Sequence, residues 1–225
     1  REGRPNEAGI LICRLVDRPM RPLFPDDLRN DVQLIVTALS HDQVNDIDML
    51  SINAASAALI ISDVPFTNPV GACRIGLVNG ELIVNPTIPE MEYSDLDLRV
   101  AGTRDAIVMV ECGANEVDEE TMVKALKLAH DSVQDFISVQ ETMRAEIGKA
   151  KSDYKKFGTN AEFNQKVRDA VGNRMQETID KELDKSERSA VIDALEGEVM
   201  AQMQSIGDVN ADELHAVIKD MTSDA

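Results

Sequence analysis

The residues best suited to chemistry are a set of arginines near the start of the chain: Arg1, Arg4, Arg14, Arg18 and Arg21. Each guanidinium group is planar and permanently charged, and it can donate paired hydrogen bonds to phosphate oxygens. The last three follow an i, i+4, i+7 spacing, which places them on one face if a helix continues that far. The segment is therefore a candidate cradle for a phosphodiester. Ion pairing, for example between Asp17 and Arg21, is the more common use of such a pattern, and both interpretations stay open.

Other chemically capable residues do not form a complete site. No HxxxH or HExxH spacing occurs among the three isolated histidines, so metal binding by this chain is not expected; they are His41, His130 and His215. Asp95 and Asp97 share one strand face and could bind magnesium, but a solvated face is favoured. Glu111 and Cys112 lie at the end of an apolar strand, but no nearby residues complete a catalytic triad with them. Cys112 is expected in the core, as a small apolar side chain.

Composition limits the kinds of partner. The chain has 225 residues and a net charge of −18, which disfavours nucleic-acid binding except at a local basic site such as the arginine segment. Aromatic residues make up only 3%, too few for a broad base-stacking surface. The three cysteines lack a CxxC spacing, and no apolar run reaches membrane-spanning length, so we expect a cytoplasmic protein without a membrane anchor. The opening arginine in place of methionine suggests an internal start.

The first 116 residues have a mixed α and β pattern. A helix capped by Asn6 should be buried all round and should end near Arg18, because prolines follow. The Asn79–Gly80 pair predicts a tight hairpin. The run at 107–110 is continuously apolar, as in a buried strand. Strands are expected at 32–39, 73–78, 81–84, 95–100 and 107–110, with a second helix at 49–61. Such a sheet would leave an edge that another segment should cover.

The remaining residues have a purely helical pattern. Asp118 should cap a long helix that ends at Gly148. Its expected buried stripe is Met122, Leu126, Ala129, Val133, Phe136, Met143 and Ile147. A polar linker at 149–159 and helices at 160–183, 186–205 and 210–221 follow, with stripes Phe163/Val167/Val171/Met175/Ile179 and Val191/Leu195/Val199. The fold class is therefore α+β, followed by an all-α region.

Several motifs resemble one known family. They are REGRP from residue 1, RLVDRPMRPLFP from 14, VQLIVT from 32, NAASAAL from 53, DVPF from 63, PVGACRIG from 69, LIVNPT from 82, SDLDLRVAGT from 94 and VMVECGANE from 108. In this order they are similar to the bacterial polynucleotide phosphorylases. The resemblance is dense across residues 1–116 and weaker in the helical remainder. It implies that residues 1–147 are part of a first RNase PH-like (ribosomal protein S5 domain 2-like) core, and residues 148–225 an all-helical linker domain.

The resemblance also implies a function. Enzymes of this family degrade single-stranded RNA from its 3′ end: inorganic phosphate attacks the terminal bond and releases nucleoside diphosphates, reversibly. They act in mRNA degradation and RNA processing as homotrimers, with RNA-degradosome proteins as further partners. Their magnesium ligands and phosphate-binding serines belong to a second core, outside this chain. The arginines at 1, 4, 14, 18 and 21 would face RNA, Arg1 as the last residue of a Phe-Phe-Arg-Arg loop, and the chain alone should be inactive.

Two alternatives differ in class. The acidic helical half could make the chain a non-catalytic scaffold that docks a protein partner. Alternatively, the chain could be an exosome-like ring subunit that lends arginines to a catalytic neighbour, although the helical half argues against this.

Overall fold

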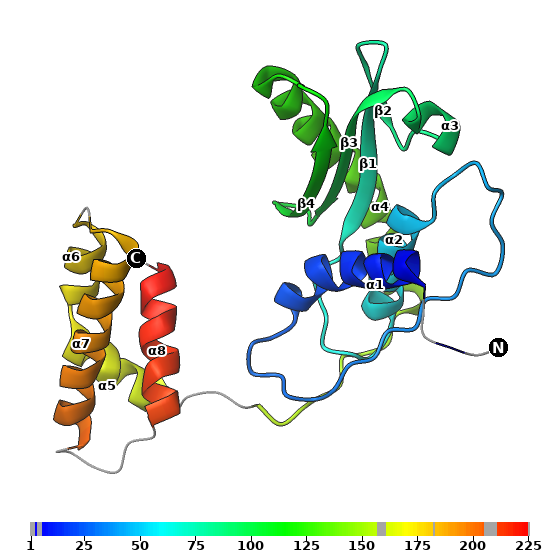
Figure 1. Ribbon diagram of the computed structural model, residues 1–225. Coiled ribbons are helices and arrows are strands. Elements are labelled where there is room, and N and C mark those ends of the chain that lie inside the picture. Colours follow the sequence, from blue (N-terminus) through cyan, green and yellow to red (C-terminus); the bar gives the residue numbers. More distant parts are fainter. Residues whose placement is uncertain (1–2, 4–5, 157–160, 182, 205–210, 225) are drawn as a thin grey trace. The chain divides into compact units, whose positions relative to one another are not determined.

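The chain folds into two compact units, Arg1–Lys155 and Lys156–Ala225. The computed structural model describes residues 3, 6–156, 161–181, 183–204 and 211–224 (Figure 1). The first unit contains a sheet with helices packed against it, and the second is built of helices. This arrangement confirms the predicted α+β fold with an all-α region.

The first helix, α1, spans Glu7–Met20. It begins where predicted, because the side chain of Asn6 accepts a hydrogen bond of 2.8 Å from the backbone N–H of Gly9. It ends two residues later than expected, with Pro19 inside its last turn, and continues into the short 3₁₀ helix η1 (Arg21–Leu23). The expectation that it is buried all round was wrong: Ile10 and Leu11 are exposed, because only one side of α1 packs on the core.

The sheet has four antiparallel strands in the order β2-β1-β3-β4. They span Gly71–Val78 (β1), Glu81–Val84 (β2), Ser94–Gly102 (β3) and Ile107–Ala114 (β4), with the short helix α3 (Ile88–Met91) before β3. The predicted hairpin is confirmed, with positive φ angles of 53° at Asn79 and 81° at Gly80. The prediction of a buried strand at 107–110 was wrong. β4 lies at an edge of the sheet, and of its residues only Met109 is buried.

Two long helices close the core of the first unit. α2 (Asp48–Ile61) packs against β1, and α4 (Glu119–Ile147) packs along β1 and β3 as well as against α2. α4 begins at the predicted cap, where Asp118 accepts from the backbone of Thr121, and it is followed by Gly148. Its predicted stripe was partly wrong: Ala129 and Val133 are buried, whereas Phe136 and Ile147 are exposed.

The phase of α4 is set by a close approach to the sheet. A Cβ atom added to Gly71 of β1 would lie 2.6 Å from the backbone oxygen of Val133, so a glycine is needed there. Small or slender residues of α4 therefore face the sheet, and the larger Phe136 turns outward. The buried residues of this helix are Ala125, Ala129, Val133, Ile137 and Gln140.

The strand predicted at residues 32–39 does not form. These residues run extended, and no described segment pairs with them. Val32, Leu34 and Val36 turn toward one side, where they line a cavity, whereas Ile35 is 79% exposed and Leu39 is 95% exposed. The alternation of a strand is present, but a strand needs a neighbour to satisfy its backbone groups.

The segment after α4 is anchored on the first unit. The backbone N–H groups of Lys149 and Ser152 donate to the carbonyl oxygens of Ile61 and Asp63, at 2.9 and 2.7 Å. The expected polar linker at 149–159 is thus packed on the first unit in its initial part. The first compact unit therefore extends past α4 to Lys155.

The second unit contains α5 (Ala161–Val171), α6 (Arg174–Ile179), α7 (Lys185–Gln204) and α8 (Ala211–Asp224). The single helix expected over 160–183 is divided at Gly172, which has a φ of +56°. Most of the predicted stripes are confirmed, although Val191 is partly exposed. The buried core consists of Val167, Val171, Met175, Leu195, Val199, Met203, Leu214, Val217, Ile218 and Met221. No described helix has the length and apolar character that a membrane crossing requires.

Candidate functional site

Three of the five predicted arginines can be placed. Arg1 and Arg4 lie outside the described residues. Arg14 and Arg18 lie one turn apart in α1, and Arg21 opens η1 directly after it. All three are exposed to solvent. They differ in what holds their guanidinium groups.

Arg18 contacts the edge of the sheet. Its Nη1 donates to Oε2 of Glu111, on β4, at 2.9 Å. Both side chains are about half exposed, 49% for Arg18 and 44% for Glu111. No other hydrogen bond of Arg18 to a described residue is present, so its remaining donors have no described partner. The contact joins residues 93 positions apart, which no helical or strand spacing could indicate.

Glu111 is also the outermost member of a network centred on Arg99 of β3. Arg99 donates through Nη1 to Glu111 at 3.1 Å and through Nε to Asp48 at 3.0 Å, and its Nη2 lies 3.2 Å from Asp97. Asp97 also receives two hydrogen bonds, of 2.7 and 2.8 Å, from Arg74. Desolvation by burial raises the pKa of Asp48. The expected solvated face thus holds for Asp95, which is exposed, whereas Asp97 is only partly exposed and is paired with two arginines.

Sequence reasoning missed this network, although one signal was available. Arg99 and Glu111 are direct partners in the antiparallel pairing of β3 and β4. Opposite charges at directly facing positions attract across a sheet. The register follows once both strands and the intervening turn are located, so this pair could have been found. The addition of Arg18 from α1 could not.

Arg21 is held by the acid that the spacing suggested. Its Nε and Nη2 donate to the two carboxylate oxygens of Asp17, at 3.0 and 2.6 Å. These hydrogen bonds and the charge of Asp17 raise the pKa of Arg21. The ion-pairing interpretation therefore applies to this residue. Arg14, by contrast, makes no hydrogen bond or ion pair with the described part of the chain.

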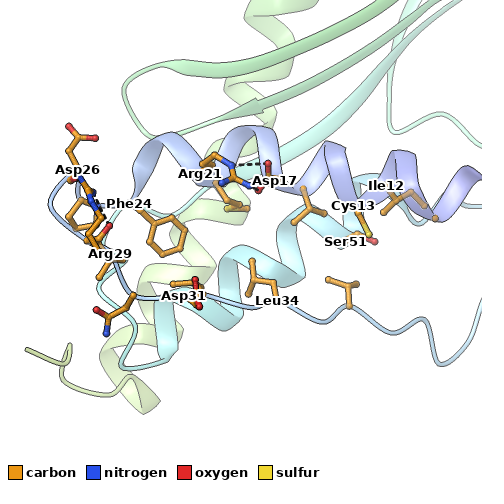
Figure 2. A pocket seen from close by; sticks show the side chains of 18 of the residues that line it. Ile12, Cys13, Asp17, Arg21, Phe24, Asp26, Arg29, Asp31, Leu34 and Ser51 are labelled. Atoms are coloured by element: carbon orange, nitrogen blue, oxygen red, sulfur yellow. Dashed lines mark hydrogen bonds and ion pairs between the residues drawn. The ribbon is translucent and has the colours of Figure 1, made fainter. Parts of the chain in front are cut away.

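A cavity of about 850 Å³ lies on another side of α1, between this helix, α2 and the extended chain at residues 24–38. Figure 2 shows Ile12, Cys13 and Leu34 beside it, with the Asp17–Arg21 pair at its edge. Arg29 also lines the cavity, and its Nη1 donates to the backbone oxygen of Asp26. Arg14 and Arg18 do not line the cavity. The three arginines thus do not converge on a single pocket.

No metal or nucleophilic centre accompanies the arginines in the described residues. No three His, Cys, Asp or Glu side chains in these ranges cluster as metal ligands. The described residues therefore do not fit magnesium. Burial raises the pKa of Cys73 to about 12, which makes it a poor nucleophile. Cys112 was expected in the core, but β4 is an edge strand and its thiol is exposed.

Family models match most of the first unit. The 3′ exoribonuclease family, domain 1, matches residues 1–65, and the 3′ exoribonuclease family, domain 2, matches residues 68–132. Two relatives are named polyribonucleotide nucleotidyltransferase. That of Halothermothrix orenii is 42% identical over 93% of this chain and 30% of its own length, and that of Thermus thermophilus is 54% identical over 67% of this chain and 21% of its own length. The chain thus spans less than a third of these relatives.

A solved structure shares the fold. The crystal structure of rice (Oryza sativa) Rrp46 aligns with a TM-score of 0.51 at 13% sequence identity. The alignment covers 63% of this chain and 68% of that one. At this identity the likeness concerns the fold alone.

Proposed function

Because the chain belongs to the 3′ exoribonuclease family, we propose that it is part of a polyribonucleotide nucleotidyltransferase that shortens RNA from the 3′ end by phosphorolysis. Its own task is to hold single-stranded RNA by the phosphate backbone. The observation that carries this proposal is the exposed face of α1, where Arg14 is without a partner in the described chain and Arg18 has donors to spare. Phosphate contacts of this kind position a nucleic acid without reading its sequence.

Phosphorolysis needs groups that hold the RNA and separate groups that carry out the attack of phosphate. Inorganic phosphate attacking a phosphodiester brings negative charges together, and cationic groups must offset them. Arginines can hold the strand, but they supply no nucleophile and no metal. We therefore propose that the chain alone is inactive. The magnesium and phosphate sites would lie in other parts of a homotrimeric, cytoplasmic parent enzyme, which could also engage RNA-degradosome proteins.

The three placed arginines should not contribute equally. Arg14 can bind a phosphate without breaking any described contact. Arg18 has one nitrogen engaged and can still present others. In Arg21, Nε and Nη2 already donate to Asp17, so this edge of the guanidinium cannot form paired hydrogen bonds with a phosphate unless that ion pair breaks. The proposed order of contribution is Arg14, then Arg18, then Arg21.

Binding of a fluorescent oligoadenylate to the full chain, followed by anisotropy at low salt, tests the gripping role. Replacing Arg14, Arg18 and Arg21 together by alanine should weaken binding by at least about tenfold. The control replaces Arg104, Arg144 and Arg188 by alanine, which changes the net charge equally at exposed sites outside α1. If both triple variants bind RNA like the wild type, the gripping role is wrong, and a scaffold that docks a protein partner becomes the better account.

The inactivity is tested separately. The purified chain, supplied with oligoadenylate, inorganic phosphate and magnesium, should release no adenosine diphosphate. Release at a rate that scales with the concentration of the chain would contradict the proposed division between gripping and reacting parts.

A further inference from the structure

Glu111 connects the proposed RNA-binding face of α1 to the interior of the first unit. One carboxylate oxygen accepts from Arg18 at 2.9 Å, and the other accepts from Arg99 at 3.1 Å. Arg18 is about half exposed, whereas Arg99 is largely covered and fixed by two further carboxylates, those of Asp48 and Asp97. Glu111 therefore has one rigid partner and one partner at the surface.

Because of this asymmetry, Arg18 can separate from Glu111 while the Glu111 carboxylate stays paired with Arg99. Separating an ion pair is unfavourable chiefly when one partner remains desolvated and unpaired. If Arg18 turns to another anion, Glu111 keeps its hydrogen bond to Arg99 and is itself partly exposed to water. Since Arg18 and Glu111 share a single hydrogen bond at an exposed position, their contact is weak enough for a phosphate to replace it.

The Asp17–Arg21 pair lacks this property. It has two hydrogen bonds instead of one, and Asp17 has no second cationic partner among the described residues. A phosphate that took Arg21 would break both bonds and leave Asp17 facing the incoming negative charge. The exchange of partners is thus specific to Arg18.

We propose that Glu111 is an internal competitor for the RNA phosphate at Arg18. Without RNA it holds Arg18 against β4. When RNA is bound, a backbone phosphate replaces Glu111 as the partner of Arg18, and Glu111 keeps only its hydrogen bond to Arg99. This inference rests on the proposed function: by competing at Arg18, Glu111 lowers the affinity of the α1 face for RNA. A strand anchored at Arg14 can displace Glu111 because the second contact is then intramolecular, whereas a single free phosphate lacks that advantage.

A double-mutant cycle tests the exchange, with the full chain and the oligoadenylate binding assay. Glu111→Gln keeps the size of the side chain and removes its charge. It should tighten binding roughly threefold to tenfold and steepen the dependence of log K on log salt by up to about 0.7. In an Arg18→Ala background the same change should have less than about a twofold effect. Glu116→Gln, an exposed charge change close in sequence, should act equally and weakly in both backgrounds.

Three outcomes would overturn the competition. These are weaker binding by Glu111→Gln, no change in binding, or an equal gain with and without Arg18. If arginine substitutions in α1 reduce RNA binding while Glu111 and Arg18 show no coupling, only this inference fails. If those substitutions leave RNA binding unchanged, the proposed function itself fails.

A second measurement follows the arginine side chains of the wild-type chain directly by NMR. Side-chain Nε–H NMR signals of the wild-type chain, assigned through single substitutions, should respond differently during RNA titration. The Arg18 signal should shift, and the Arg99 signal should stay in place. A shift of Arg99 equal to that of Arg18 would contradict an exchange in which Glu111 remains anchored.

Discussion

Ser56 of α2 and Gln140 of α4 share a buried hydrogen bond of 2.6 Å, although 84 positions separate them in the sequence. Gln140 also donates to the backbone oxygen of Val70 at 2.8 Å, and the N–H of Val70 donates to Ser56 Oγ at 2.8 Å. This closed set of hydrogen bonds joins both helices to the chain entering β1. It fixes the scaffold under α1, which packs on α2.

Removing the amide from this set should weaken the first unit. Gln140→Ala leaves a buried backbone oxygen without its donor, and we expect a loss of about 2 kcal/mol in the opening free energy of α2 and α4. Amide hydrogen exchange measured by mass spectrometry reports this loss helix by helix. Val139→Ala is the matched control, because this neighbouring side chain is 59% exposed and should have little effect. Equal protection in the two variants would show that the buried set is not stabilising.

The arginines of α1 should be separable one at a time. Arg14→Ala should weaken RNA binding most, roughly threefold to tenfold, Arg18→Ala less, and Arg21→Ala least. The reason is the number of existing hydrogen bonds that a phosphate must replace: none described at Arg14, one at Arg18 and two at Arg21. Dissociation constants for the single variants at one salt concentration measure the order. A largest effect at Arg21 would show that the existing hydrogen bonds do not determine the order.

The side chain of Lys151 should hold the segment that follows α4 against the end of α2. Its ammonium group donates to the carbonyl oxygens of Leu59, Ile60 and Ser62, at the C-terminal end of α2, at 2.9 to 3.1 Å. Lys151→Met should release residues 149–155, speed their amide exchange and expose them to trypsin, at a stability loss of about 1 kcal/mol.

Lys149 provides the control for the Lys151 substitution. It contributes its backbone N–H to Ile61, but its side chain is exposed, so Lys149→Met should leave the segment in place. If the two variants exchange at the same rate as the wild type, the segment is held by its backbone contacts alone and the side chain of Lys151 is dispensable.

The three cysteines should differ sharply in alkylation. Cys13 is exposed beside the cavity and should react first with iodoacetamide. Burial, with a contribution from Asp97, raises the pKa of Cys112, so this exposed thiol should react more slowly. Cys73, with a pKa of about 12, should be inert in the folded chain, because at pH 8 only roughly one such thiol in ten thousand is ionised.

Peptide mass spectrometry at successive times gives the order of modification. Raising the pH from 7 to 9 should accelerate Cys112, because the thiolate is the reactive form. Rapid labelling of Cys73 without unfolding would contradict the packing of β1 against α4.

Features governed by neighbouring residues were predictable from the sequence. The caps Asn6 and Asp118, the Asn79–Gly80 hairpin and the Asp17–Arg21 pair all depend on residues within four positions of one another. Features governed by distant contacts were not. The strand expected at 32–39 lacks a described partner, and the face of α4 is chosen by its approach to Gly71.

The candidate site divides in the same way. The arginines could be named from their type and spacing, and the resemblance to a family gave them a role. What distinguishes Arg18 from Arg21 is Glu111, which reaches α1 only because β4 pairs with β3 at the sheet edge. That relation depends on the tertiary fold, which the helical spacing of the arginines does not encode.

If this chain binds RNA through α1, the contact should be open to covalent capture. The most direct test is photo-crosslinking of the full chain to an oligonucleotide that carries 4-thiouridine, followed by identification of the crosslinked peptides. Crosslinks are expected within and beside α1 and η1, and they should be lost when Arg14, Arg18 and Arg21 are replaced together. Crosslinks confined to the helices of the second unit, unchanged by those substitutions, would contradict it.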